Sequence, residues 1–380
     1  MQVDPIRPFT AAVPQAALDD LRERLARTRW PERETADDWD QGIPLAYAQE
    51  LAAYWRDEYD WRRVEARLNA LPNYLVAIDG LDIHFLHVRS PNPAARPLIL
   101  THGWPGSVLE FLDVIEPLSA DYHLVIPSLP GYGFSGKPAG AGWGVERIAA
   151  AWDALMRALG YDRYFAQGGD WGSVVTSMIG ANHADHCAGI HINMVAGAPP
   201  PDLMEGLTDA EKLYLARMGW YRDKDSGYST QQATRPQTIG YALTDSPVGQ
   251  MAWIVEKYHG WTDCGHRPGG QSIGGHPERI LSRDAMLDTV SLYWLTASAA
   301  SSARLYWQSF RNFSAGEIHV PTGCSLFPNE IMRLSRRWAE RRYTNIVHWN
   351  ELDRGGHFAA WEQPELFVDE VRAALGVMTL

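Results

Sequence analysis

The feature that most constrains the fold of this chain is a regular alternation of short apolar runs with amphipathic segments in its middle third. The runs at 98–100, 123–126 and 189–195 are mostly apolar, as expected of strands that are covered on both faces. Segments of helical period separate them, for example at about 108–118 and 145–159. Strand and helix units in this order predict a mainly parallel, doubly wound sheet, the α/β class.

The chain on either side of this alternation has a different pattern. The first ninety residues predict several helices, followed by a hairpin whose turn is Asp79-Gly80. Residues 198–315 carry helical patterns and many aromatic side chains but no convincing strand, and the strand pattern resumes at about 318–327 and 346–352. We therefore predict four parts, namely an N-terminal arm (1–90), a first core part (91–197), a helical lid (198–315) and a second core part (316–380).

Composition excludes several classes of function. Acidic residues outnumber basic residues by 46 to 34, and the net charge of −12 gives no general attraction for phosphate backbones, so we expect no nucleic-acid partner. The cysteines (Cys187, Cys264 and Cys324) form no CxxC pair, which favours a reducing compartment. Because we find neither a signal-peptide pattern nor an apolar stretch of about 18 residues, we expect a cytoplasmic protein without a membrane partner.

The densest functional signal is the segment 167–173, Gln-Gly-Gly-Asp-Trp-Gly-Ser. Gly168 and Gly172 flank Asp170 by two positions on either side, between an apolar run and a helix-like segment. Only small neighbours permit the sharp strand-to-helix turn that raises a nucleophile above a sheet. A carboxylate at that place can attack an electrophilic sp3 carbon and form an alkyl ester. The alternative interpretation is an ordinary turn in which Asp170 caps the helix.

A second cluster follows the first apolar run, at the end of the strand where open α/β sheets bind ligands. It contains His102, Gly103, Trp104 and Pro105. In the nucleophile-elbow architecture this loop gives one backbone N–H to an oxyanion hole, and the residue after the nucleophile gives the other. The two donors would then be Trp104 and Trp171.

His357 is the candidate general base. It follows a strand pattern and a Gly-Gly turn, and it is the last of 13 histidines, as the chain order nucleophile–acid–histidine requires. A base must be oriented by an acid. Glu330, just past the resumed strand, is the preferred acid, and Asp353 is the rival.

Cofactor and metal motifs are missing from the sequence. The segment 131–136 matches G-x-G-x-x-G by letters, but Pro127 and Pro130 precede it, and Lys137-Pro138 follows where a helix should open. We find neither an H-E-x-x-H pattern nor a Gly-Lys-Ser/Thr loop. We therefore expect no nucleotide cofactor and no metal.

These clusters together resemble the epoxide hydrolases of the α/β-hydrolase superfamily, specifically the microsomal-type branch. The matching segments are the loop at 102–105, the elbow at 168–173 and the segment at 355–362. The segment 6–31 is similar to the helical arm of that branch, and the lid stretch 234–249 also matches. The resemblance covers nearly the full chain and implies an α/β-hydrolase fold with a helical lid before the last strands and an N-terminal helical arm.

The resemblance also assigns roles. It makes Asp170 the nucleophile, His357 the base that activates water, and Glu330 the acid partner of His357. The two lid tyrosines that give protons to the epoxide oxygen in this branch correspond to Tyr228 and Tyr306. Two further tyrosines remain as alternatives, Tyr241 and Tyr293.

The implied activity is conversion of an epoxide and water to a vicinal diol through a covalent ester on Asp170, without a cofactor. Lid aromatics such as Trp220, Tyr221 and Trp253 favour an apolar or aromatic epoxide, in detoxification or in natural-product biosynthesis. The mammalian microsomal enzymes begin with a membrane anchor that is absent here, so the chain resembles the soluble bacterial members. The alternatives are a haloalkane dehalogenase and a catalytically inactive binding protein of the same fold, and a homodimer through the lid or the arm is a further hypothesis.

Overall fold

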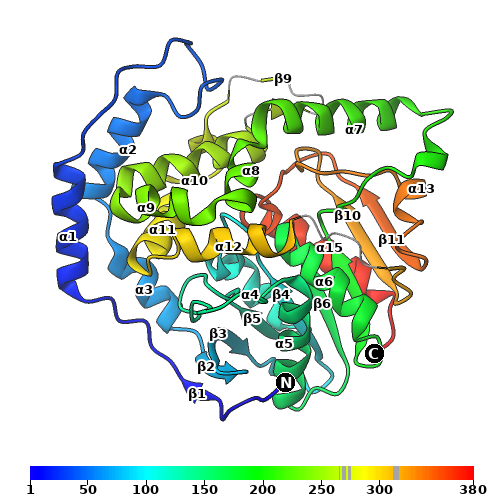
Figure 1. The fold of residues 1–380 in the computed structure, drawn as a ribbon. Coiled ribbons are helices and arrows are strands. Elements are labelled where there is room, and N and C mark those ends of the chain that lie inside the picture. The colour runs from blue at the N-terminus through cyan, green and yellow to red at the C-terminus, as the bar shows by residue number, and fades with distance from the viewer. Residues whose placement is uncertain (265, 268–270, 273–274, 311–315) are drawn as a thin grey trace.

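One nine-stranded sheet organises the molecule in the computed structural model, which describes residues 1–264, 266–267, 271–272, 275–310 and 316–380 (Figure 1). Its strands lie side by side in the order β1 (Arg7–Pro8), β2 (Asn73–Ile78), β3 (Leu81–Val88), β5 (Tyr122–Pro127), β4 (Arg96–Thr101), β6 (Tyr164–Gly168), β7 (Cys187–Ile192), β10 (Thr322–Leu326) and β11 (Ile346–Glu351).

The predicted mainly parallel sheet is confirmed. All neighbouring strands from β5 to β11 pair in parallel, whereas β1, β2 and β3 join the sheet antiparallel. The hairpin between β2 and β3 turns at Asp79 (φ 48°) and Gly80 (φ 78°), the two positive φ values that a tight Asp-Gly hairpin turn needs. The central strands β4, β5 and β6 are buried on both sides, which explains their continuous apolar sequence.

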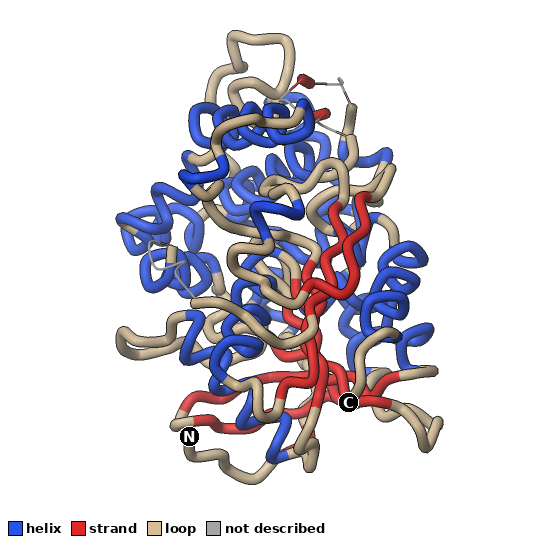
Figure 2. The backbone as a smooth tube through the Cα atoms, turned by 90° about the vertical axis from the view of Figure 1, so that its right-hand side faces the viewer, coloured by secondary structure: helices blue, strands red, loops and turns tan. Residues whose placement is uncertain are grey.

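Helices cover both faces of this sheet (Figure 2). α5 (Val145–Ala158) and α6 (Asp170–Asn182) pack against each other, and α6 contacts the central strands. α4 (Leu112–Ser119), α14 (Ala359–Glu362) and α15 (Pro364–Gly376) form a second group. The sequence predicted one helix over 108–118, but a 3₁₀ turn (Val108–Phe111) precedes α4 there, capped by Ser107 and Glu110. A short helix, α13 (Arg336–Ala339), connects β10 and β11.

The arm and the lid lie beside each other away from the parallel strands (Figure 1). The arm helices are α1 (Gln15–Ala26), α2 (Leu45–Asp57) and α3 (Trp61–Asn69). The lid helices are α7 (Asp209–Trp220), α8 (Gly227–Thr234), α9 (Pro236–Asp245), α10 (Pro247–Trp261), α11 (Arg283–Leu295) and α12 (Ala299–Ser309). The expectation that the lid has no strand is wrong, because β8 (His266–Arg267) and β9 (Gln271–Ser272) form a short antiparallel ladder. Two-residue strands are too short to leave a period in the sequence. Among the described helices, none is long and apolar enough to cross a membrane.

The carboxyl ends of the parallel strands place the predicted site residues on one edge of the sheet. His102 follows β4, Asp170 follows β6, Glu330 follows β10 and His357 follows β11. The lid covers this edge, since its residue Trp261 accepts a hydrogen bond from the backbone of the loop after β11. The residue boundaries of the four predicted parts stay a prediction.

Candidate active site

The elbow between β6 and α6 holds Asp170 in a backbone conformation that few residues adopt. Its φ is +50°, in the left-handed region, which costs a residue other than glycine about 1–2 kcal/mol. The turn is so tight that a Cβ on Gly168 would lie 2.1 Å from the carbonyl oxygen of Gly172, and a Cβ on Gly172 would lie 1.9 Å from that of Thr101. The small residues on either side are therefore a steric requirement for presenting the Asp170 carboxylate above the sheet.

The loop after β4 approaches that carboxylate from one side. The backbone N–H of Trp104 donates to Asp170 Oδ1 at 2.7 Å, and the peptide bond between Trp104 and Pro105 is cis. His102 supports the loop from inside, because its Nε2 accepts from the N–H of Leu129 and its Nδ1 can then donate to the carbonyl of Gly103. Burial lowers the pKa of His102 to about 4, so this ring is neutral and structural.

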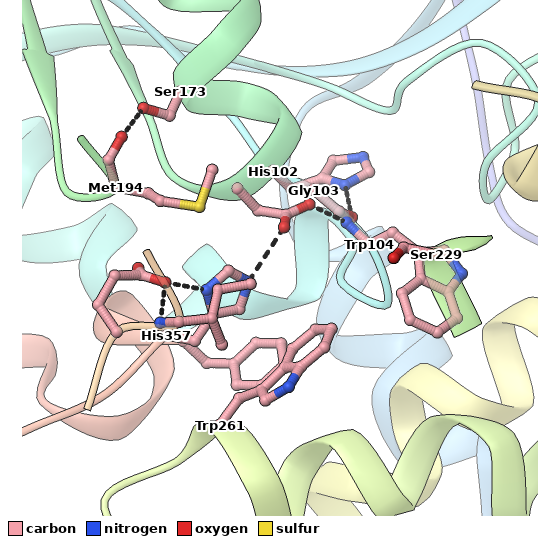
Figure 3. Close-up of polar contacts among 12 residues, drawn as sticks. His102, Gly103, Trp104, Ser173, Met194, Ser229, Trp261 and His357 are labelled. Carbon is pink, nitrogen blue, oxygen red and sulfur yellow. Dashed lines mark hydrogen bonds and ion pairs between the residues drawn. The ribbon is translucent and has the colours of Figure 1, made fainter. Parts of the chain in front are cut away.

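The loop after β11 approaches from the other side. His357 Nε2 lies 3.2 Å from Asp170 Oδ2, and His357 Nδ1 lies 2.6 Å from Glu330 Oε1. Figure 3 draws these contacts as dashed lines, with Trp104 and His357 on opposite sides. The side chains of His357 and Glu330 are buried, at 2% and 1% exposure, and that of Asp170 is partly buried, at 13%. The structure therefore brings the predicted nucleophile, base and acid into one hydrogen-bonded row.

Two carboxylates set the charge of the imidazole. Burial by itself lowers the pKa of His357, but the charges of Glu330 and Asp170 and their contacts to the ring outweigh it and raise this pKa well above its usual value. The two contacts therefore favour the protonated form of the ring in the resting site.

The lid takes part in positioning His357. The backbone N–H of His357 donates to the carbonyl of Trp261 at 2.9 Å, and the two rings meet edge to face with centroids 5.0 Å apart (Figure 3). Asn329 Nδ2 contacts the next lid carbonyl, that of Thr262, and the backbone N–H of Asn329 donates to Gly355. The loops that carry the base and the acid are thus joined to each other and to the lid.

The rival acid lies elsewhere. The side chain of Asp353 is 83% exposed and pairs with its neighbour Arg354 at 3.2 Å. Glu330 Oε1 also accepts a hydrogen bond from the backbone N–H of Ile331 at 2.7 Å. Of the two carboxylates, only Glu330 is placed to orient the imidazole.

Both predicted lid tyrosines are buried near the nucleophile. The ring of Tyr228 stacks on that of Trp104 with centroids 5.0 Å apart and planes at 9°. Tyr306 meets the rings of Tyr228 and Trp171 edge to face, at 5.8 and 4.9 Å. Trp171 itself lies in the first turn of α6, directly after Asp170, and its place as the second oxyanion donor stays a prediction.

The two alternative tyrosines occupy different places. Tyr241 is 70% exposed on α9. Tyr293 is buried, but its hydroxyl donates to the carbonyl of Gly106 at 2.9 Å and so braces the loop after β4.

Asp170 separates two small cavities of different character. One has a volume of about 30 Å³. It is lined by Asp170, by mainly apolar side chains and by three tyrosines, Tyr221, Tyr228 and Tyr306. The other has a volume of about 20 Å³, which is enough for a single water molecule, and its lining includes Asp170, His357 and Glu110. A carboxylate between an apolar and a polar cavity can meet an organic substrate on one side and water on the other.

Two residues that line these cavities, Glu110 and Tyr221, were not predicted as site residues from the sequence. Glu110 belongs to a Ser107-x-x-Glu110 capping box, a recognisable pattern, but only the fold turns its carboxyl toward the nucleophile. The sequence marks Tyr221 only as one of the lid aromatics, although it lies seven residues before Tyr228, about two helical turns away. In the part of the chain that the structure describes, no three His, Cys, Asp or Glu side chains gather as they would around a metal ion.

Comparison with known families agrees with this geometry. A family profile described as the epoxide hydrolase N terminus matches residues 6–111, and one described as the alpha/beta hydrolase fold matches residues 96–238. A protein of Stigmatella aurantiaca (strain DW4/3-1), provisionally named an epoxide hydrolase, is 52% identical over 97% of this chain and 84% of its own length. Epoxide hydrolase 1 of Sus scrofa is 34% identical over 98% of this chain and 89% of its own.

Solved structures give the same answer. The structure of Aspergillus niger epoxide hydrolase superposes with a TM-score of 0.88 at 35% identity, covering 98% of this chain and 96% of that one. The juvenile hormone epoxide hydrolase from the silkworm Bombyx mori superposes with a TM-score of 0.89 at 31% identity, covering 98% and 94%. These likenesses favour epoxide hydrolysis over the dehalogenase and binding-protein alternatives. This chain belongs to the epoxide hydrolase family and is an epoxide hydrolase of the α/β-hydrolase fold.

Proposed function

We propose that this enzyme opens epoxides in two steps, through a covalent ester on Asp170. The observation that carries the proposal is the placement of that carboxylate, with Trp104 N–H on Oδ1, His357 on Oδ2, and a tyrosine-lined cavity beside it. Since Oδ1 lies at the proposed oxyanion donor Trp104, Oδ2 is the atom that attacks the epoxide carbon, with a lone pair that does not face His357. Oδ1 then becomes the ester carbonyl oxygen, already in position in the oxyanion hole.

Ring opening uses the lid. As Oδ2 bonds to carbon, the ring C–O bond breaks and its electron pair moves to the epoxide oxygen. Tyr228 and Tyr306 supply hydrogen bonds and a proton to that oxygen. Phenols are neutral at pH 7 and can donate without a strong acid nearby.

Hydrolysis of the ester uses the polar cavity. Ester formation removes the negative charge of Asp170, which is one of the charges that raise the pKa of His357. The imidazolium then loses its proton more readily, to the tyrosinate that ring opening leaves, by way of solvent. The neutral imidazole can accept a proton from water, while Glu330 stabilises the imidazolium that forms. The water attacks the Asp170 carbonyl carbon from the cavity that Glu110 lines, and the oxyanion forms on Oδ1 next to Trp104 N–H.

The substrate we propose is an apolar epoxide, and an aryl epoxide such as styrene oxide is a suitable test compound. Beyond the tyrosines, the cavity that faces the epoxide is lined by Trp171, Val174, Met194, Phe310, Ile331 and Met332. These side chains offer no charge to a polar substituent and favour burial of apolar surface. They fit a substrate for detoxification as well as one in biosynthesis.

The first experiment is the hydrolysis of racemic styrene oxide in 18O-labelled water. With enzyme in excess, a single turnover should give unlabelled diol, because the oxygen comes from Asp170, and repeated turnover should give labelled diol. Label in the diol of the first turnover would mean direct attack by water and would overturn the ester mechanism.

A variant of His357 tests the same mechanism at the step of ester hydrolysis. His357→Gln should form the ester but hydrolyse it slowly, so that the protein mass rises by the mass of the substrate. Asp170→Ala is the matched control and should show no adduct. Diol formation by Asp170→Ala at the rate of the unchanged enzyme would refute the nucleophile assignment.

Two further proposals concern the cellular compartment and the oligomeric state of the enzyme. Cys187, Cys264 and Cys324 are all free and buried, which supports function in a reducing cytoplasm. A homodimer is tested by the molar mass in solution.

A further inference from the structure

A third tyrosine contacts the proton donors of the proposed site. The hydroxyl of Tyr221 lies 2.9 Å from that of Tyr228, and it also donates toward Ser229 Oγ at 3.3 Å. Ser229 Oγ in turn donates to the carbonyl of Ser226 at 2.9 Å. Tyr221 is 8% exposed and lines the same cavity as Asp170, Tyr228 and Tyr306. These two contacts satisfy the hydrogen-bonding capacity of the Tyr221 hydroxyl.

The backbone around Tyr221 is irregular. Residues Tyr221–Asp225 form a π-helical turn at the end of α7, a local widening that is frequent at functional sites. Its other end is fixed by a buried network in which Asp225 accepts from Trp261 Nε1 and from Lys257 Nζ, both at 2.7 Å. The same Lys257 ammonium lies 4.8 Å from the ring centroid of Tyr228. The network therefore fixes the π-helical turn relative to Tyr228, which keeps the two phenols in contact.

Hydrogen counting shows what this contact can do. Each phenol has a single proton, and its oxygen can accept as well as donate. When Tyr228 turns its proton toward an epoxide oxygen, its own oxygen loses the partner to which that proton pointed. Tyr221 can then turn its proton from Ser229 to Tyr228, because Ser229 keeps its hydrogen bond to the carbonyl of Ser226.

We propose that Tyr221 is a positioning residue for ring opening, which donates to the oxygen of Tyr228 while Tyr228 donates to the epoxide. This rests on the proposed roles of Asp170 and Tyr228. As the C–O bond breaks, its electron pair goes to the epoxide oxygen, which takes the proton of Tyr228, and the charge left on Tyr228 is shared with the Tyr221 hydroxyl. The proton that His357 loses after ester formation returns by way of solvent to the Tyr228 oxygen. The proton that His357 then takes from water restores the imidazolium, so that epoxide and water balance the diol.

The electrostatics of the lid make such help necessary. Burial raises the pKa of Tyr228 well above its usual value, and in the resting arrangement the contact with Tyr221 raises this pKa further. Tyr228 therefore becomes a better acid only when Tyr221 turns its proton toward the Tyr228 oxygen. Burial also raises the pKa of Tyr221 to about 12, so Tyr221 keeps its proton at neutral pH and remains a donor. A hydrogen bond to a charged group contributes more than one between neutral groups, so the contact strengthens as ring opening proceeds.

The test is Tyr221→Phe, with ester formation and ester hydrolysis measured separately by rapid mixing with 1,2-epoxypropane. We expect ester formation to slow about tenfold or more, as the loss of a hydrogen bond to a developing charge predicts, and ester hydrolysis to stay unchanged. The unchanged hydrolysis rate shows that the variant is folded. Tyr214→Phe is the matched control, since Tyr214 is a buried phenol of α7 whose hydroxyl donates to Glu351, and it should leave both rates unchanged.

A second epoxide separates proton donation from packing. The alkoxide of 3,3,3-trifluoro-1,2-epoxypropane is less basic than that of 1,2-epoxypropane, although the two epoxides are similar in size. The defect of Tyr221→Phe should therefore be smaller with the fluorinated epoxide. Equal defects with both epoxides, equal slowing of both half-reactions, or no slowing at all would overturn the proposal. Tyr228→Phe separates the proposed role of Tyr228 from that of Tyr221. If both Tyr228→Phe and Tyr221→Phe leave ester formation unchanged, the role of Tyr228 fails. If only Tyr228→Phe slows ester formation, the role of Tyr221 alone fails.

Discussion

At the scale of single residues, Asp170 must serve two reactions that need opposite surroundings. Attack on an epoxide benefits from a dry, apolar cavity, whereas hydrolysis of the ester requires one water with acceptors for its protons. The side chain lies between the tyrosine-lined cavity and the cavity that contains His357 and Glu110. This placement allows one carboxylate to take part in both steps, with the epoxide on one side of it and the water on the other.

Glu110 carries the first prediction. Its Oε1 accepts the backbone N–H of Ser107 at 3.0 Å, which leaves Oε2 to accept from a water in the small cavity. Burial raises the pKa of Glu110 to about 8, so its carboxylate forms only as the pH rises through that value. Glu110→Gln replaces an acceptor by an amide that donates, and we expect ester hydrolysis to slow about tenfold to a hundredfold and to lose its rise with pH near 8.

The measurement is the decay of the ester from pH 6 to 9 after a single turnover with styrene oxide. Glu116→Gln, an exposed change on α4, is the control and should behave like the unchanged enzyme. If ester hydrolysis in Glu110→Gln kept both its rate and its pH profile, Glu110 would have no part in holding the water.

The sequence predicted the residues that have local signatures. Asp170 and Trp104 lie in glycine-containing turns after strands, and His357 is marked by its position near the end of the chain order. Glu330 and Asp353 could not be separated with certainty from spacing, because the decision depends on which loop turns inward. The contacts of Tyr221 and Glu110 with the site could not be predicted, since a π-helical turn and a capped 3₁₀ turn decide where these side chains point.

At the scale of elements, the site depends on how closely α6 approaches β4. The start of α6 touches the end of β4, and there is no space for a side chain at Gly172. The contact places the elbow next to the loop that carries Trp104.

Gly172→Ala is the prediction at this scale. The new Cβ would lie 1.9 Å from the backbone oxygen of Thr101, which cannot move away as the end of a flexible side chain could. We expect the free energy of unfolding to fall by about 3 kcal/mol or more and activity to be lost. Gly219→Ala is the matched control, because a Cβ there meets nothing within 4 Å in α7, and helix propensity should stabilise it by about 0.5–1 kcal/mol. Urea unfolding measures both, and an undiminished stability of Gly172→Ala would show that the elbow is not sterically constrained.

The element pattern was predictable where burial imposes a period. The apolar runs of the sequence predict β4, β5 and β7, and the helical period at 145–159 predicts α5. β1 was not predicted, because it has two residues, one of them Pro8, and pairs only at the edge of the sheet.

At the scale of the whole molecule, the arm holds the lid in place over the site. Trp55 Nε1 of α2 donates to Ser291 Oγ of α11 at 2.9 Å. Asp288 of α11 accepts from Tyr59 at 2.8 Å and from Arg63 of α3 at 2.6 Å. These partners are more than 200 residues apart, so no local pattern in the sequence could predict them. The arm therefore packs against the lid by long-range polar contacts as well as extending the sheet.

The pH dependence of stability tests this connection. Burial raises the pKa of Asp288 to about 6, although Arg63 and Tyr59 act in the opposite direction. Because the folded chain keeps this proton to a higher pH than the unfolded chain does, the contribution of Asp288 to stability must fall as the pH rises from about 4 to 6. The full loss is about 3 kcal/mol above that window, at about 1.4 kcal/mol per pH unit.

Asp288→Asn cannot titrate and keeps its size, so it should escape this loss. We expect the unfolding free energy of the unchanged enzyme, relative to Asp288→Asn, to decrease by up to about 3 kcal/mol between pH 4 and pH 7 in urea titrations. Asp209→Asn, at a fully exposed carboxyl on α7, is the control and should follow the pH profile of the unchanged enzyme. A constant difference between the unchanged enzyme and Asp288→Asn across this range would mean that Asp288 is ionised at the arm–lid contact without cost. The arm would then hold the lid by an ion pair with Arg63 that is already complete at acidic pH, and the attachment of the lid would not weaken as the pH rises toward neutrality.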